Sequence, residues 1–344
     1  MNPEPTKSAL MKPSQIVHLL DQAVVGQMEA KKTLAVAVYS HFRKSAKALA
    51  DAGHLVKSNV LLVGSTGTGK TLLCETLSRI LGAPFVTADA TTLAQSEFVN
   101  TEIEAILQRL LDRAGGDVAR AQRGLVFIDE VDKLKAVGER SRAASGESVQ
   151  HALLKIMEGS QVRLANGVYI DTTHILFICG GAFVGLSDII KNSQSYGYLS
   201  FEEGDNQEIL KRLSARIKPT DLLTFGLVPE FAGRLPVIAR LQDLTKDMMV
   251  RIMVEPRDSV YRQYRDILKS DGVELSIKPV VFEQIAEIAL GYKVGARSLR
   301  GIFEELMTDV LYALPDNPGI RKVVFDSLFE PPRSLSAAHP EAAA

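Results

Sequence analysis

Four short apolar runs alternate along the chain with longer stretches in which apolar residues recur every three or four positions. The runs are NVLLVG at 59–64, APFVTA at 83–88, GLVFID at 124–129 and HILFIC at 174–179. Runs of this length predict buried strands, and the stretches between them predict helices. Their alternation predicts an α/β fold in which a parallel sheet is covered by helices on both faces.

The pattern becomes helical near residue 242. Helical periodicity covers Thr245–Leu268, Pro279–Leu290 and Ala296–Leu311, and the strand-like run RKVVFD follows. We therefore expect a large α/β domain over 14–241 and a smaller, mostly helical α+β domain over 242–328. Residues 1–13 are expected to form a flexible tail, and the Pro-, Ala- and Ser-rich residues 329–344 a disordered one.

Composition narrows the class of protein. The 344 residues are 46% hydrophobic and 24% charged, and 40 basic against 41 acidic residues give a net charge of −1. The chain therefore has no overall electrostatic attraction to nucleic acid or to an anionic membrane. No run approaches the roughly 18 apolar residues of a membrane span, and the start lacks a signal peptide, so we expect a cytoplasmic protein. Cys74 and Cys179 lie in apolar segments and predict two structural thiols, not a disulfide or a zinc site.

A candidate phosphate site follows the first strand. The segment GSTGTGKT at 64–71 has the spacing G-x-x-x-x-G-K-[ST], and a helical stretch follows it. Glycines in such a loop let backbone N–H groups surround phosphate oxygens, and the helix N-terminus adds its positive dipole end. The binding loop thus comprises Ser65, Thr66, Gly67, Thr68 and Gly69, with Lys70 at the β- and γ-phosphates of ATP and Thr71 on Mg²⁺. An ordinary Gly-rich turn is the less favoured alternative.

Two carboxylates end the third strand. VFIDEVD places Asp129 and Glu130 where ligands bind in open α/β sheets. Asp129 would hold Mg²⁺ through water, and Glu130 would polarise the attacking water, because phosphoryl transfer depends on positioning and charge neutralisation. An Asp-Glu pair alone is more often a solvated turn, but a phosphate loop in the same sheet reverses that balance.

Several longer segments give the chain a family resemblance. It resembles the AAA+ ATPases, and within them the ClpX-type protein unfoldases, from about Pro13 to Asp326. The resemblance rests on VVGQMEAKKTLAVAVYSHF, GSTGTGKTLLCETL, ADATTL, RGLVFIDEVDKL, SGESVQHALLKIMEG, ILFICGGAF, FGLVPEFAGRLPVIARL and GARSLRGIFEEL. It implies an AAA+ fold, ATP and Mg²⁺ as cofactors, and a ring of identical subunits, usually six.

The resemblance also implies roles for residues outside the phosphate loop. Arg234 of EFAGRLP matches the arginine that reaches a neighbouring subunit's nucleotide, and Arg297 of GARSLR the one that senses the γ-phosphate within its own subunit. Val24 and Val25 match part of the adenine pocket. Without the resemblance, each arginine would be assigned to a surface salt bridge.

The segment after ADATTL matches the family's substrate-gripping pore loop, which has a Gly-aromatic-Val-Gly core. Phe98 and Val99 keep the aromatic residue and the valine, whereas Glu97 and Asn100 replace the glycines. An aromatic side chain can push on any polypeptide by apolar and steric contact, so Phe98 and Val99 are our candidate substrate contacts. The alternative is that Phe98 packs under the following helix as a hydrophobic staple.

Three other family features are changed or missing. The resemblance does not include the four-cysteine zinc domain that precedes the ATPase module in the family, and only a short turn at Asn166-Gly167 stands where the family has a basic loop. Residues 187–210 contain no Gly-Phe dipeptide of the kind that docks the ClpP-like peptidase, so that partner is doubtful. The sequence thus favours a specialised protein remodeller without the usual peptidase. The alternatives are the ATPase subunit of a Clp-type protease with a diverged docking loop, or a non-catalytic ATP-binding assembly regulator.

Overall fold

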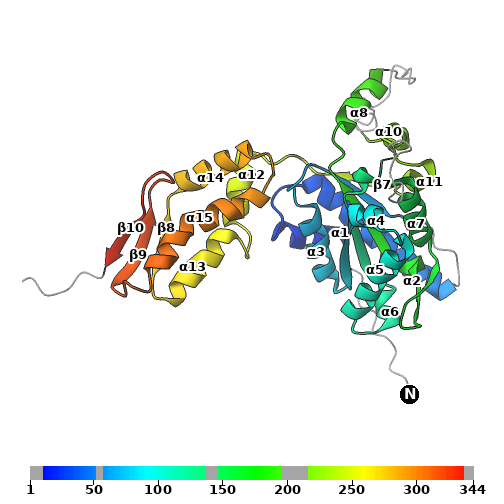
Figure 1. Cartoon of the computed structure of the whole chain (residues 1–344), viewed down its shortest axis with the longest axis horizontal. Helices are drawn as coiled ribbons and strands as arrows, with labels where there is room; N and C mark the ends of the chain where they lie inside the picture. The colour runs from blue at the N-terminus through cyan, green and yellow to red at the C-terminus, as the bar shows by residue number, and fades with distance from the viewer. Residues whose placement is uncertain (1–10, 52–56, 136–145, 196–215, 337–344) are drawn as a thin grey trace, which may run out of the picture. The chain divides into compact units, whose positions relative to one another are not determined.

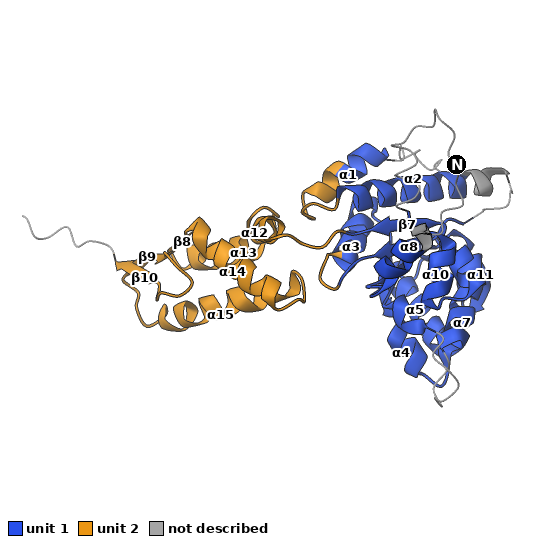
Figure 2. Ribbon diagram, turned by 90° about the horizontal axis from the view of Figure 1, so that it is seen from above, with its two compact units in different colours: residues 1–17, 28–65, 70–241 blue, residues 18–27, 66–69, 242–344 orange. Residues whose placement is uncertain are grey.

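The computed structural model describes residues 11–51, 57–135, 146–195 and 216–336. They divide into two compact units (Figure 2). The first comprises 1–17, 28–65 and 70–241, and the second comprises 18–27, 66–69 and 242–344. Among the described helices, none is both long and apolar enough to cross a membrane.

A five-stranded parallel sheet forms the centre of the first unit (Figure 1). Its order is β2-β3-β6-β1-β7, with β1 at Val60–Val63, β2 at Phe85–Asp89, β3 at Leu125–Asp129, β6 at Leu176–Gly181 and β7 at Val237–Arg240. All residues of β1 and β6 are buried, as expected for parallel strands that are covered on both faces. The predicted α/β class is confirmed, and the four predicted strands are all present. β7, at the sheet edge, was not predicted.

Helices cover this sheet and supply most of its core. They are α2 (Met28–Asp51), α3 (Lys70–Leu81), α4 (Ala90–Gln95), α5 (Val99–Arg113), α6 (Val118–Ala121), α7 (Gly146–Glu158), α10 (Pro219–Phe225) and α11 (Pro229–Gly233). α8 (Leu186–Ser195) extends away from the sheet (Figure 1), and α1 (Pro13–Asp21) is divided between the two units. On α5, Ile103, Ile106, Leu107, Leu110 and Leu111 form one buried stripe at helical spacing. Polar and charged residues occupy the opposite face of α5, and some of them line a pocket.

The expected turn at Asn166-Gly167 closes a small hairpin. β4 (Gln161–Arg163) pairs antiparallel with β5 (Tyr169–Asp171). The Asn166 side chain accepts from the Val168 N–H at 3.0 Å, and Gly167 has φ +82°, a left-handed conformation that glycine adopts without strain.

The second unit is more mixed than its sequence predicts. Its elements are α12 (Lys246–Val254), α13 (Val260–Ser270), β8 (Glu274–Ile277), α14 (Pro279–Gly291), α15 (Arg297–Ala313), β9 (Ile320–Phe325) and β10 (Arg333–Ser336). The single helix predicted over Thr245–Leu268 is two helices, because Pro256 has no N–H to donate within a helix and its ring clashes with the carbonyl group four residues earlier. β8 and β10 flank β9 in one sheet. The tail predicted over 329–344 therefore contains a strand, held by antiparallel pairing with β9.

Candidate functional site

The phosphate loop joins β1 to α3 at the carboxyl end of the sheet. Gly67 and Gly69 have φ values of +77° and +100°, a region that disfavours residues with a Cβ. Gly69 is a fixed glycine of the motif, and its backbone explains that requirement, whereas Gly67 is an additional glycine at a variable position. α3 begins at Lys70, directly after the loop. The free N–H groups of its first turn can therefore bind an anion that the loop holds.

Lys70 is the buried cation of this loop. Its Nζ donates to the carbonyl oxygens of Gly64 at 2.6 Å and Ser65 at 3.2 Å, and 8% of the residue is exposed. These backbone contacts fix the ammonium group beside the loop before any nucleotide binds. A phosphate chain in the loop would meet a positioned positive charge, which lowers the reorganisation that binding requires.

Thr71 and Asp129 bring two oxygen ligands together. The Thr71 Oγ1 donates to Asp129 Oδ2 at 3.4 Å, although the residues lie on α3 and β3. A hydroxyl beside a carboxylate at the end of a parallel strand fits Mg²⁺, which prefers oxygen ligands and keeps several waters. The residue pair predicted for the metal is thus placed at one point of the sheet edge.

Glu130 follows directly and has an unusual backbone. Its φ and ψ are 59° and 30°, left-handed values that are uncommon for a residue with a side chain, and its N–H donates to Asp129 Oδ1 at 2.9 Å. This turn lets two adjacent residues serve different purposes. Asp129 is partly buried beside Thr71, whereas Glu130 is exposed to solvent.

Asp132 is a residue of this region that sequence reasoning missed. It is 3% exposed, and its Oδ2 accepts from the backbone N–H of Phe183, just beyond β6, at 3.1 Å. A buried carboxylate needs such a partner, and this one ties the Asp-Glu turn to the end of β6. The signal was available in VFIDEVD, where a third acid follows Glu130 by two positions.

Val24, Val25 and Arg297 belong to the second unit. Both valines are buried, at 5% and 7% exposure, after the end of α1. Arg297 is the exposed first residue of α15. Their predicted contacts with adenine and γ-phosphate stay predictions.

Arg234 lies at the opposite end of the sheet from the phosphate loop. Its backbone carbonyl accepts from Asn59 Nδ2 at 3.2 Å, and Asn59 directly precedes β1. The phosphate loop follows β1, and five residue steps of about 3.3 Å separate Asn59 from Gly64 by about 16 Å. The Arg234 guanidinium is paired with Glu158, at 2.6 Å from Nη2 and 2.8 Å from Nε to Oε1. The structure therefore does not bring Arg234 to the phosphate loop of its own chain.

Phe98 and Val99 have different environments. Phe98 is 70% exposed at the N-terminus of α5, and its N–H donates to Ser96 Oγ at 3.2 Å. Val99 is half-buried and packs against the core of the first unit. Phe98 is thus available for contact, and its exposure does not fit the hydrophobic-staple alternative. Most of the expected docking segment 187–210 lies outside the described residues, which resume at 216.

Both cysteines are free and buried, in line with structural thiols. Burial raises the pKa of Cys179 to about 12 and, with the nearby Asp129 and Glu75 carboxylates, raises the pKa of Cys74 well above its usual value. Neither thiol forms a reactive thiolate near neutral pH.

Comparison with known proteins places this site in a family. Residues 55–238 match the model of the AAA domain (Cdc48 subfamily), and residues 244–320 match that of the C-terminal, D2-small domain of ClpB protein. The chain is 44% identical to an "ATP-dependent Clp protease ATP-binding subunit ClpX 3" of Methylococcus capsulatus, over 92% of this chain and 79% of the relative. Proteins called "ATP-dependent Clp protease ATP-binding subunit ClpX" in Borrelia duttonii and Azotobacter vinelandii are each 43% identical, over 91% and 89% of this chain and 76% and 75% of theirs.

The parallel sheet, the phosphate loop and the carboxylate pair at β3 define an AAA+ ATPase, an enzyme that binds and hydrolyses ATP. Within that class, the chain belongs to the ClpX-type ATPases.

Proposed function

We propose that this ATPase works as a ring of six copies, the number usual in the family, and that each ATP is hydrolysed between two copies of the chain. The observation that carries the proposal is the position of Arg234 at the amino end of β1, with Lys70, Thr71 and Asp129 beyond its carboxyl end. An arginine in this position is better placed to contact the nucleotide of another subunit than the nucleotide of its own chain. A guanidinium supplied across an interface neutralises transition-state charge and makes hydrolysis depend on assembly.

Within each proposed site, each residue has a distinct role. Lys70 holds the β- and γ-phosphates, and Thr71 and Asp129 hold the Mg²⁺ ion, whose charge neutralises phosphate oxygens when it is bound. Glu130 orients the attacking water and accepts its proton, a role that its exposed carboxylate allows. Val24 and Val25 contact adenine, and Arg297 senses the γ-phosphate.

We further propose that hydrolysis is used to pull on protein substrates in the cytoplasm. Phe98 is the proposed contact, because a 70% exposed aromatic ring at a helix N-terminus offers apolar area to any extended polypeptide. Val99 then supports the loop by packing against the core. Since Glu97 and Asn100 replace two flexible glycines, the loop is stiffer than in the family and suits a narrow set of substrates, without the usual peptidase.

A second candidate function is favoured by the names of the relatives, which describe ATP-binding subunits of a Clp protease. In that case this chain would deliver unfolded substrate to a ClpP-like barrel through a diverged docking segment. Co-purification of such a peptidase with the tagged chain, in an ATP-dependent manner, would decide for it.

Trapping with Glu130→Gln tests the proposed function. This variant should bind ATP, assemble and hold protein substrate without releasing it, so that substrates co-purify and can be identified. Glu130→Gln, Phe98→Ala should assemble equally but retain far less substrate. If the trap assembles with ATP and retains no protein, the proposed action on proteins is wrong.

A further inference from the structure

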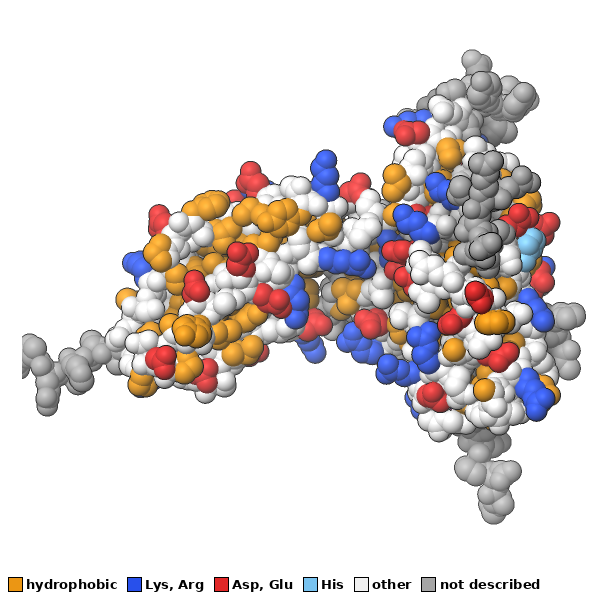
Figure 3. All heavy atoms as spheres, viewed as in Figure 1, with side chains coloured by type: hydrophobic (Ala, Val, Ile, Leu, Met, Phe, Trp, Pro, Cys, Tyr) orange, Lys and Arg blue, Asp and Glu red, His pale blue; other side chains and the backbone are white. Residues whose placement is uncertain are grey.

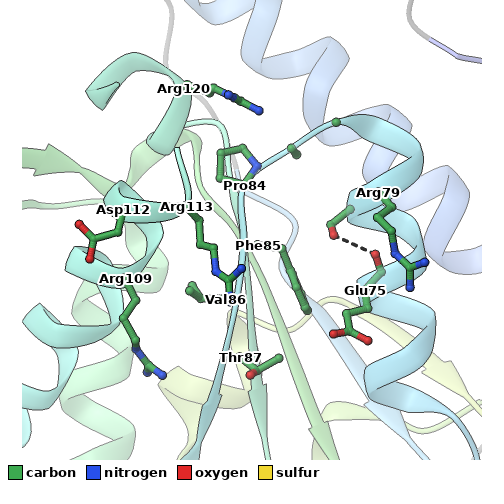
Figure 4. A pocket seen from close by; sticks show the side chains of 13 residues that line it. Glu75, Arg79, Pro84, Phe85, Val86, Thr87, Arg109, Asp112, Arg113 and Arg120 are labelled. Atoms are coloured by element: carbon green, nitrogen blue, oxygen red, sulfur yellow. Dashed lines mark hydrogen bonds between the residues drawn. The ribbon is translucent and has the colours of Figure 1, made fainter. Parts of the chain in front are cut away.

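A surface pocket of about 740 Å³ lies at the free edge of β2, away from the phosphate loop (Figure 4). β2 is the outermost strand of the sheet, so one of its edges has no neighbouring strand. Side chains from α3, α5 and α6 surround this edge. Its volume is within the range of small-molecule sites.

Four arginines line the pocket. Arg79 comes from α3, Arg109 and Arg113 from α5, and Arg120 from α6. Figure 4 shows Arg109 and Arg113 extending from α5 toward β2, with Arg120 above Pro84. Within the described ranges, none of the four guanidinium groups takes part in an ion pair or a side-chain hydrogen bond. On the face drawn in Figure 3, basic side chains gather in the same area, around α3 and α6.

The two acids in the lining do not neutralise these arginines. Asp112 accepts instead from Gln108 Nε2 at 2.9 Å, and the described residues show no ion pair between Glu75 and Arg79, although they are one helical turn apart. Four arginines less two acids leave a formal charge of +2 on a chain whose net charge is −1. Arg109 and Arg113 are also four residues apart on α5, a spacing at which like charges destabilise a helix. A bound anion would neutralise this excess of positive charge most directly.

We propose that this pocket binds a compound with two or more phosphate groups. A guanidinium presents parallel N–H groups that match the oxygens of a phosphate, and a phosphate has more acceptor oxygens than a carboxylate, so several arginines can share one group. The half-buried Phe85 ring adds an apolar wall between α3 and α5. The enclosing helices and the near-neutral chain argue against a nucleic-acid strand as the occupant.

The pocket is connected to the ATP site through shared residues. Arg109 and Thr87 also line a second pocket, of about 570 Å³, that contains Thr71 and Asp129. A phosphate compound that draws the Arg109 guanidinium into the first pocket withdraws positive charge from the neighbourhood of the Mg²⁺ ligands. Occupancy therefore changes the rate of ATP hydrolysis, a coupling that does not depend on whether the protein unfolds substrates.

Calorimetric titration with inorganic pyrophosphate tests the site. It is done on the full chain with Lys70→Ala, which weakens competing binding at the phosphate loop. We expect one saturable site. The double variant Arg109→Ala, Arg113→Ala should lower its affinity at least tenfold. The double variant Arg109→Lys, Arg113→Lys should lower it less, because it keeps the charge but loses the parallel N–H groups of the two guanidinium groups. Arg163→Ala, an exposed arginine on β4, is the matched control and should leave the affinity unchanged.

Further titrations distinguish the source of the phosphates. Equal affinities for pyrophosphate, ADP and GDP indicate a free phosphate chain, whereas tighter binding of one nucleoside diphosphate indicates a nucleotide. Absence of saturable binding would overturn the proposal, as would equal weakening by Arg163→Ala. Binding of an oligoglutamate peptide without binding of pyrophosphate would also overturn it and would make the pocket a protein-docking surface. Circular dichroism of each variant checks that the fold is retained.

Discussion

Gly180 and Gly181 end β6 because neighbouring side chains occupy the space that a Cβ would fill. A Cβ at Gly180 would lie 2.7 Å from Phe127 Cζ and 3.2 Å from Asp129 Oδ1, and one at Gly181 would lie 2.5 Å from Asp132 Oδ1. This close approach explains why the chain has glycine at both positions. The two glycines let both carboxylates approach the sheet.

We predict that Gly180→Ala lowers the turnover number more than it lowers the affinity for ATP. The added methyl group presses on Phe127 and on the Asp129 carboxylate, whereas no phosphate-loop atom is among its three nearest neighbours. Overpacking of this kind costs about 1–3 kcal/mol of folding stability. Steady-state hydrolysis, nucleotide titration and urea unfolding measure the three effects. Gly301→Ala, on α15 with open space around it, is the control: it should leave turnover and ATP affinity unchanged and raise stability by about 0.5–1 kcal/mol, because glycine is unfavourable inside a helix. Wild-type turnover in Gly180→Ala would contradict the prediction.

The ion pair between Arg234 and Glu158 contributes little free energy, and this leads to a prediction. The two side chains are 52% and 41% exposed, and ion pairs with this degree of exposure contribute at most about 1 kcal/mol. Releasing Arg234 from Glu158 therefore has a small cost when another subunit's ATP offers a stronger partner. Glu158→Gln should change turnover by less than about fivefold, the equivalent of 1 kcal/mol.

Arg234→Ala should instead reduce turnover by about a thousandfold or more, the effect expected of a missing transition-state arginine, while nucleotide binding is retained. Hydrolysis assays on the two variants, at saturating ATP and matched protein concentration, make the comparison. Equal losses in both variants would mean that the ion pair itself, and not the release of Arg234, supports activity.

At the scale of elements, α2 is anchored by a buried histidine. His41 is 2% exposed, and its Nε2 lies 3.0 Å from the carbonyl oxygen of His174, so Nε2 carries a proton and donates to that oxygen. Burial is the largest cause that lowers the pKa of His41 to about 4, and the positive charges of Lys57 and Lys44 act in the same direction. The ring of His174 is held in turn by Ser45 Oγ, at 2.8 Å from Nδ1.

This histidine predicts acid sensitivity of the first unit. Because the folded pKa of about 4 is below the ordinary value of 6.5, the unfolded chain binds more protons between these values. The contribution of His41 to stability is complete above pH 6.5 and is lost as the pH falls toward 4. Urea unfolding of wild type and His41→Gln from pH 7.5 to 4.5 measures it, since effects of the carboxylates cancel in the difference. The stability advantage of wild type should shrink on acidification, and a difference that stays constant would contradict the assignment.

The elements that sequence reasoning predicted are those fixed by local pattern. Apolar runs predicted β1, β2, β3 and β6, and the glycine spacing predicted the loop before Lys70. β7 and β10 were missed because an edge strand is half-exposed or polar, as in the fully exposed β10, and is held by pairing that no local pattern encodes. Likewise, the contact between Asp132 and Phe183 joins residues 51 positions apart. The arginines of the pocket at β2 were also unpredicted, because only the packing of α3, α5 and α6 around one strand brings them together.

In the whole assembly, the proposed sharing of each site between two copies would let one copy repair an incomplete site of another, because Arg234 lies apart from Lys70 and Glu130. A subunit with Arg234→Ala keeps its phosphate loop and Glu130, and a subunit with Glu130→Gln keeps Arg234. Each variant alone forms only defective sites. When the two are mixed, an interface that takes Glu130 from the first and Arg234 from the second has every group.

We therefore predict that a mixture of these two variants hydrolyses ATP although each alone does not. With equal amounts and random assembly, about a quarter of the interfaces combine the two intact halves, so turnover should approach about a quarter of wild type if sites act independently. A mixture of Glu130→Gln with Lys70→Ala is the control, because both changes damage the same half of the site and no interface is repaired. Hydrolysis rates of the mixtures, measured after co-refolding or subunit exchange, test this directly. If the first mixture stays as inactive as the control while size-exclusion chromatography shows mixed assemblies, Arg234 does not act across the interface, and the shared-site arrangement is wrong.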